Sequence, residues 1–164
     1  MNTFFQQTIT DRLLSDAPAV FDWLLSDERF TDSNWDSIKK SKFTKRVKRL
    51  NGFGDTTFMK KTNDIAYPVI QTKRNRKRKP YALFSSSGSL GQDFVRHVRN
   101  AIAHGRVEVY KSNGSDYLEM TDIGTHGQTA YIAMPVNYLH SLYRIYLEVS
   151  GNSQSRQKGK KRLR

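Results

Sequence analysis

The segment from Ser89 to Gly105 constrains the fold most, because helix signals stand at both of its ends. Ser89 and Gln92 have the spacing of a capping box, which opens a helix, and glycine commonly ends one. At about 100° per residue, the apolar positions gather on one side. They are Leu90, Phe94, Val95, Val98, Ala101 and Ile102. We therefore expect a helix that buries this side and carries polar residues, among them Arg99 and His104, on the other.

Alternating apolar and polar residues follow this helix, at 107–110 and again at 117–120. Ser112-Asn113-Gly114-Ser115 lies between them and is a strong turn signal, so the two stretches predict a β-hairpin. Residues 129–134 could add a third strand. Apolar residues then recur at helical spacing over 136–149, and Gly151 ends this last helix.

The first half of the chain also predicts helices. A helical pattern over 4–26 is broken at Asp16-Ala17-Pro18, and another helix is expected over 33–50, with Asp36 at capping-box spacing from Ser33. Residues 51–84 mix turn residues with short apolar groups, so the sequence leaves their path open. We expect one mainly α domain over residues 1–151 that contains a basic loop at 71–80, and a disordered basic tail at 152–164.

Positive charge is concentrated in two blocks. The net charge is +13, and residues 37–82 hold fifteen basic residues against Asp55 and Asp64, while residues 150–164 hold six and no acid. Bases without acidic neighbours repel one another and favour a polyanionic partner, so we expect the chain to bind RNA. A solvated surface without a partner and, for residues 73–79, a nuclear-import signal are the alternatives.

Two absences narrow the range of functions. The chain has no cysteine, which excludes disulfides, thiolate catalysis and cysteine-based zinc sites. No stretch approaches the roughly 18 apolar residues of a membrane span, and the N-terminal residues lack the pattern of a signal peptide. We expect a soluble, cytoplasmic protein that does not engage a membrane.

Arg99-Asn100, followed by His104-Gly105, resembles the Arg-(four residues)-His motif of HEPN domains, many of which are metal-independent endoribonucleases. A hairpin and a final helix after the motif helix resemble one subgroup of that family, so the likeness covers residues 85–150. It implies a HEPN-like helical bundle with a small β-hairpin between the motif helix and the last helix. It also implies RNA as the substrate, no cofactor, and a homodimer in which two copies of the motif form one composite active site.

The resemblance extends to regulation. HEPN ribonucleases of this kind include toxins and defence effectors, which would make a protein inhibitor a further partner. In some HEPN toxins that pair with a nucleotidyltransferase antitoxin, the partner modifies a tyrosine two residues after the motif histidine. Arg106 stands at that position here, so we do not expect regulation through such a tyrosine.

The three motif residues have distinct chemical abilities, and we expect them to be catalytic. An imidazole, with an ordinary pKa of about 6.5, can take or give a proton when a ribose 2′-hydroxyl attacks the adjacent phosphate, which makes His104 the expected acid/base. Arg99 can place a permanent charge and a planar fork of donors on the scissile phosphate. Asn100, one turn before His104, can orient the imidazole or the phosphate by hydrogen bonding.

Further basic residues are expected to contact RNA, in three groups along the chain. The helix over 33–50 contributes Lys39, Lys40, Lys42, Lys45 and Arg46. The basic loop contributes Lys73, Arg74, Arg76, Lys77, Arg78 and Lys79. The flanks of the motif contribute Arg96 and Arg106.

Structural interpretations of the motif compete with the catalytic one. Arg99 could pair with Asp93 or Glu108, and His104 could merely cap its helix. His97 lies about 10 Å from His104 along the helix, too far to share an ion, so we expect no metal site and expect His97 to be exposed or a flanking RNA contact. At the level of function, the alternatives to a ribonuclease are a non-catalytic RNA-binding module and an interaction domain for a nucleotide or a partner protein.

Overall fold

The computed structural model describes residues 18–26, 35–50 and 79–151. Within these ranges it has four helices, which are α2 (Pro18–Ser26), α3 (Ser37–Lys48), α6 (Leu90–Ala103) and α7 (Tyr138–Ser150). The helix expected before residue 18, the basic residues at 73–78 and the tail at 152–164 lie outside the described residues. None of the described helices is long and apolar enough to cross a membrane.

Four strands form one antiparallel sheet. They are β1 (Tyr81–Phe84), β2 (Val107–Ser112), β3 (Ser115–Gly124) and β4 (Gly127–Pro135), in the spatial order β1-β4-β3-β2. The predicted hairpin is confirmed as β2 and β3, with Asn113 and Gly114 at positive φ in its turn. The suggested strand over 129–134 is also confirmed, as part of the longer β4.

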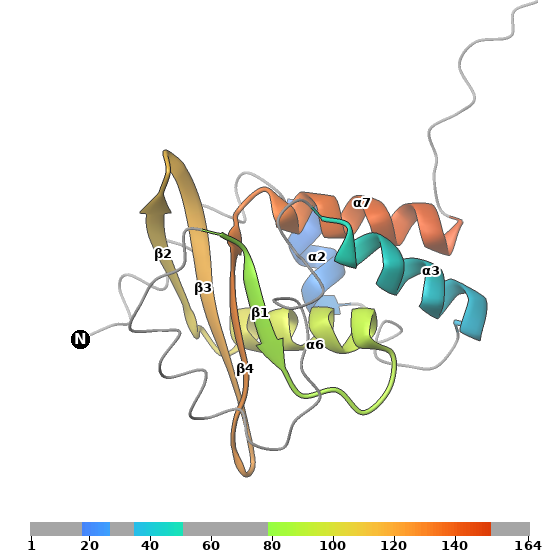
Figure 1. Cartoon of the computed structure of the whole chain (residues 1–164), viewed down its shortest axis with the longest axis horizontal. Coiled ribbons are helices and arrows are strands. Elements are labelled where there is room, and N and C mark those ends of the chain that lie inside the picture. The colour runs from blue at the N-terminus through green and yellow to red at the C-terminus, as the bar shows by residue number, and fades with distance from the viewer. Residues whose placement is uncertain (1–17, 27–34, 51–78, 152–164) are drawn as a thin grey trace, which may run out of the picture.

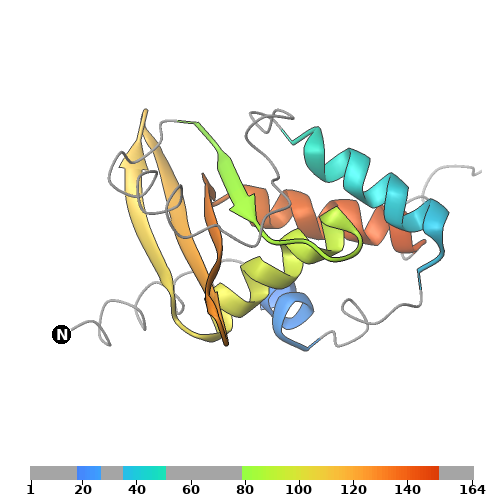
Figure 2. The ribbon, with the colours of Figure 1, turned by 60° about the horizontal axis from the view of Figure 1, so that its bottom comes forward.

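The expectation of a mainly α bundle with a small hairpin is wrong. The sheet has four strands rather than two, and the helices lie on one of its faces, as Figures 1 and 2 show from two directions. β1 was not predicted because it lies within residues 51–84, for which the sequence predicts no defined element. Its four residues, Tyr-Ala-Leu-Phe, do not alternate in polarity, since both faces of the sheet are covered at this strand.

The main core lies between the sheet and the helices. Alternate residues of the strands point into it, such as Phe84 in β1, Met120 in β3 and Ile132 in β4. The expected apolar side of α6 fills its centre, with Phe94, Val95, Val98, Ala101 and Ile102 buried, while Leu90 is only half-buried. A smaller cluster, made of Leu83, Tyr131 and Ala133, occupies the opposite face of the sheet.

The helix α3 begins later than the sequence predicts. Asp36, rather than Ser33, is its N-cap, and the Asp36 carboxylate accepts a 2.7 Å hydrogen bond from the backbone N–H of Lys39. Phe43 and Val47 are fully buried in the core. The exposed side of α3 carries most of its lysines.

The helices α3 and α6 approach each other closely at Gly91. The backbone N–H of Gly91 donates a 3.0 Å hydrogen bond to the Thr44 hydroxyl. A Cβ at this position would lie 2.8 Å from Cδ1 of Phe43 and 2.9 Å from Oγ1 of Thr44. Glycine therefore allows the contact between the two helices.

We expect Gly91→Ala to lower the free energy of unfolding by about 1–3 kcal/mol, because the added methyl group overpacks this contact. The better helix propensity of alanine, worth about 1 kcal/mol, offsets only part of that loss. Urea denaturation followed by circular dichroism measures the change. Gly88→Ala is the matched control, since a Cβ there meets nothing within 4 Å. Equal stabilities for the two variants would contradict the prediction.

Candidate functional site

The motif residues Arg99, Asn100 and His104 lie together on the final turns of α6. The helix ends at His104 in a Schellman motif, in which the backbone N–H of Arg106 bonds the Ala101 carbonyl at 2.8 Å and that of Gly105 bonds the Ile102 carbonyl at 3.0 Å. Gly105 has φ of 63°, which glycine adopts without strain. The motif glycine thus fixes the point at which the helix stops and His104 leaves it.

Arg99 is half-buried and His104 is exposed. Within the part of the chain that the structure describes, neither side chain has a hydrogen-bond or ion-pair partner. The suggested pairing of Arg99 with Asp93 is not seen, because Asp93 binds Arg96 instead, at 2.9 Å. His104 is indeed the C-cap residue, but its backbone makes that contact and its imidazole extends outward. Both functional groups are therefore available to a ligand.

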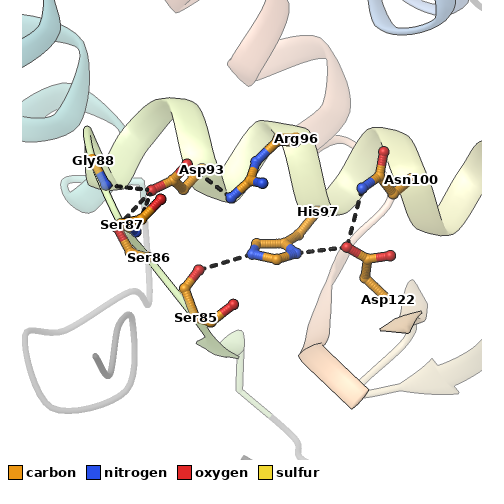
Figure 3. Close-up of polar contacts among 9 residues, drawn as sticks. All are labelled: Ser85, Ser86, Ser87, Gly88, Asp93, Arg96, His97, Asn100 and Asp122. Carbon is orange, nitrogen blue, oxygen red and sulfur yellow. Dashed lines mark hydrogen bonds and ion pairs between the residues drawn. The ribbon is translucent and has the colours of Figure 1, made fainter. Parts of the chain in front are cut away.

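Asn100 is held by the sheet. Its Nδ2 donates a 3.2 Å hydrogen bond to Oδ2 of Asp122 near the end of β3 (Figure 3). On the surface of α6, Asn100 lies angularly between Arg99 and His104. The side chain of Asn100 is thus held in place by a hydrogen bond, whereas the side chains of Arg99 and His104 are not.

His97 is buried, with 2 % of its surface exposed, so its expected place at the surface is wrong. Its Nδ1 lies 2.7 Å from Oδ2 of Asp122, and its Nε2 lies 2.8 Å from the backbone carbonyl of Ser85, just after β1 (Figure 3). The ring also packs near Phe84, with centroids 5.6 Å apart. His97 was expected to be exposed because the sequence did not reveal that the sheet covers this side of α6.

Both ring nitrogens of His97 face oxygen atoms that accept hydrogen bonds. A backbone carbonyl can only accept, and the Asp122 carboxylate accepts as well when it is ionised. Burial acts to raise the pKa of Asp122, but hydrogen bonds from His97 and Asn100, the charge of His97 and a hydrogen bond from Thr129 together lower it. With Asp122 ionised, both contacts are hydrogen bonds when each nitrogen of His97 carries a proton, and the pair is then a buried imidazolium–carboxylate ion pair.

A second carboxylate organises the start of α6. Oδ2 of Asp93 accepts hydrogen bonds from the Ser86 hydroxyl at 2.7 Å and from the backbone N–H groups of Ser87 and Gly88 at 3.1 Å each (Figure 3). Ser89 is the N-cap, as predicted, but its side chain makes no capping hydrogen bond. Asp93 thus stabilises the entry into the helix, where a capping box of Ser89 and Gln92 was expected.

Among the described residues, the predicted RNA contacts divide into those whose side chains are free and those that bind other parts of the fold. Lys39, Lys42, Lys45 and Lys79 are exposed, and Lys40 is half-buried. Three of the arginines bind the fold, since Arg46 pairs with Glu148 of α7, Arg96 with Asp93, and Arg106 with the Ile123 carbonyl at 3.3 Å. α3 packs at Gly91, about 20 Å along α6 from His104, so its lysines lie at the end of α6 away from the motif.

Asp122 is the site residue that the sequence analysis missed. The signal was present, because positions 118, 120 and 122 share one face of a strand, and Leu118 and Met120 are core residues. A carboxylate on the core side of a strand needs a buried partner. Among the described residues, no group of three or more His, Cys, Asp or Glu side chains could hold a metal ion.

The Asp93 contacts should make stability depend on pH. Burial acts to raise the Asp93 pKa, but the bonds from Ser86, Gly88 and Ser87 and the charge of Arg96 lower it below its ordinary 3.8. The stabilisation is therefore complete above that value and is lost as the pH falls through the lower folded pKa. We expect Asp93→Asn to lower the free energy of unfolding by about 1–2 kcal/mol at pH 6. Urea titrations between pH 7 and pH 3 should show this difference shrinking at the acid end, and a constant difference would contradict the assignment.

Comparison with known proteins identifies the family. The profile of a family described as HEPN pEK499 p136 matches residues 24–157, which is most of the chain and includes α6, the sheet and α7. No curated protein and no solved structure gives a match. HEPN families are associated with nuclease or RNA-related functions in general, and the expected resemblance is confirmed at the level of the family. The chain belongs to the HEPN family pEK499 p136.

Proposed function

We propose that this protein is a metal-independent endoribonuclease that cleaves RNA by attack of a ribose 2′-hydroxyl on the adjacent phosphate. One observation carries the proposal. The side chains of Arg99 and His104 have no hydrogen-bond or ion-pair partner among the described residues, although the helix that bears them is anchored at both ends. A helix fixed at both ends, with the Arg99 and His104 side chains free of contacts within the described structure, is suited to bind a substrate in a defined position.

The reaction needs two proton transfers. A base removes the proton of the 2′-hydroxyl, the bond from that oxygen to phosphorus forms, and the bond to the 5′-oxygen breaks as an acid protonates it. The products are a 2′,3′-cyclic phosphate and a 5′-hydroxyl. The exposed His104 imidazole can serve as base or acid. Arg99 stabilises the charge that builds on the phosphate oxygens in the transition state.

The exposed lysines of α3 support a role in binding RNA. Between Ser37 and Lys48 the helix contains no acidic residue, and Lys39, Lys42 and Lys45 are exposed. Such flexible point charges neutralise phosphates without reading sequence, so we assign them non-specific contacts with the RNA backbone. This surface also favours the second candidate, a non-catalytic RNA-binding module. A toxin or defence role, with a protein inhibitor as partner, belongs to the first candidate.

Arg99→Ala and His104→Ala should each abolish most RNA cleavage, with kcat/KM reduced by about 100-fold or more, because one removes transition-state charge stabilisation and the other removes proton transfer. The assay incubates single-stranded RNA in excess EDTA and identifies 2′,3′-cyclic phosphate ends. Loss of activity in EDTA would contradict a metal-independent mechanism.

Two exposed residues of α7 provide matched controls. Arg144→Ala and His140→Ala remove the same functional groups from a helix that does not carry the motif. Both should cleave RNA like the wild type. If all four variants lose activity equally, the motif has no special role, and if wild type binds RNA without cutting it, the binding module is the better description.

A homodimer with a composite active site completes the proposal. Each chain contributes one His104, whereas the reaction uses one group as base and another as acid. Two copies facing each other would supply both. We therefore expect the active species to sediment as a dimer in analytical ultracentrifugation at assay concentration. A monomer with full activity would exclude the composite site.

A further inference from the structure

The Asp122 carboxylate connects two elements of the site that lie far apart in the sequence. A single oxygen, Oδ2, receives Nδ1 of His97 at 2.7 Å and Nδ2 of Asn100 at 3.2 Å. His97 and Asp122 are 2 % and 5 % exposed, so neither can touch RNA. Among the three, only Asn100 belongs to the motif, so the side-chain contact by which Asp122 reaches the motif is its hydrogen bond with Asn100.

We propose that Asp122, supported by His97, is a positioning residue of the active site that fixes the Asn100 amide with its carbonyl oxygen toward the motif face. This inference rests on the ribonuclease function proposed above. It extends the active site from the motif helix to β3.

The orientation follows from the chemistry of the acceptor. An ionised carboxylate has no proton to donate, so the Asn100 amide must turn its NH₂ group toward Asp122. Its Oδ1 then points away from Asp122, as Figure 3 shows. Because Asn100 lies angularly between Arg99 and His104 on α6, we infer that Oδ1 is an acceptor on the motif face that can accept a hydrogen bond from the substrate or from the His104 ring.

His97 keeps Asp122 in the ionised state and in place. Its second nitrogen is held by the Ser85 carbonyl at 2.8 Å, so the imidazolium cannot turn away from Asp122. A buried ion pair adds little net stability, because removing two charges from water costs about as much as their attraction returns. The main consequence of the His97–Asp122 pair is therefore that it orients the Asn100 amide, rather than that it stabilises the fold.

Asp122→Asn tests the proposal while preserving the shape of the side chain. An amide at this position offers both a donor and an acceptor, so it can pair with either orientation of the Asn100 amide, and the constraint is lost. We expect kcat to fall about tenfold to a hundredfold, as for a misplaced catalytic group, with KM for RNA changed less than about twofold. Asp116→Asn, on the same strand but without a side-chain contact to α6 in the described structure, is the matched control and should behave like the wild type.

A double-mutant cycle separates positioning from a general structural effect. In the Asn100→Ala background there is no amide to orient, so Asp122→Asn should cause no further loss of kcat. An equal loss in both backgrounds, or an unchanged kcat in Asp122→Asn alone, would overturn the inference. If wild type shows no cleavage at all, or if cleavage survives in Arg99→Ala and His104→Ala, the proposed function itself fails.

The side-chain amide of Asn100 gives a readout that does not depend on activity. In nitrogen-15 NMR spectra of wild type, one of its two protons should be protected from solvent exchange and shifted by the carboxylate, and Asp122→Asn should move that signal. This measurement on wild type decides the matter even if the variant fails to fold. Two amide protons that exchange rapidly and alike would overturn the proposed orientation.

Discussion

The ion pair between His97 and Asp122 ties the motif helix to the sheet, and the arrangement of the site depends on it. Both charges are buried, and moving an ion out of water costs several kcal/mol. That cost is tolerable only if the remaining hydrogen-bonding positions are filled. The Ser85 carbonyl, the Asn100 amide and Thr129 fill them. β1, α6, β3 and β4 therefore meet at one point, and each depends on the others for its polar contacts.

Around this point the structure restrains the backbone of α6 and leaves selected side chains free. Asp93 fixes the start of the helix through the loop at 86–88, and the Schellman motif at Gly105 fixes its end. On the side that faces the sheet, His97 and Asn100 are engaged, whereas His104 lies on nearly the same side but beyond the cover of the sheet and is exposed. The same helix thus combines rigid support with reactive groups that are open to a ligand.

Much of this could be predicted from the sequence, and the parts that could not have physical reasons. Local signals were sufficient for α6, α7 and the hairpin, because periodicity, Asn113-Gly114 and Gly105 act within a few residues. β1 was missed because a strand covered on both faces shows no alternation, and the expected fold class counted neither β1 nor β4. His97 and Asp122 are 25 residues apart, and pairing over that separation leaves no local pattern. Only the placement of Asp122 on the core side of its strand pointed to a partner.

The basic side chains of the described residues fall into two groups, those that bind other parts of the fold and those that are free. Four of the seven arginines predicted for the site lie among the described residues. Of these four, Arg46, Arg96 and Arg106 bind carboxylates or a carbonyl of the fold, and only Arg99 has no such partner within the described structure. The free charges on α3 are lysines, whose compact ammonium groups attract phosphates without fixing their geometry. A planar guanidinium can instead bind two oxygens of one phosphate in a defined orientation. In the proposed function, the lysines of α3 therefore supply non-specific attraction, while the unengaged guanidinium of Arg99, on the same helix as His104, supplies the defined phosphate geometry that cleavage needs.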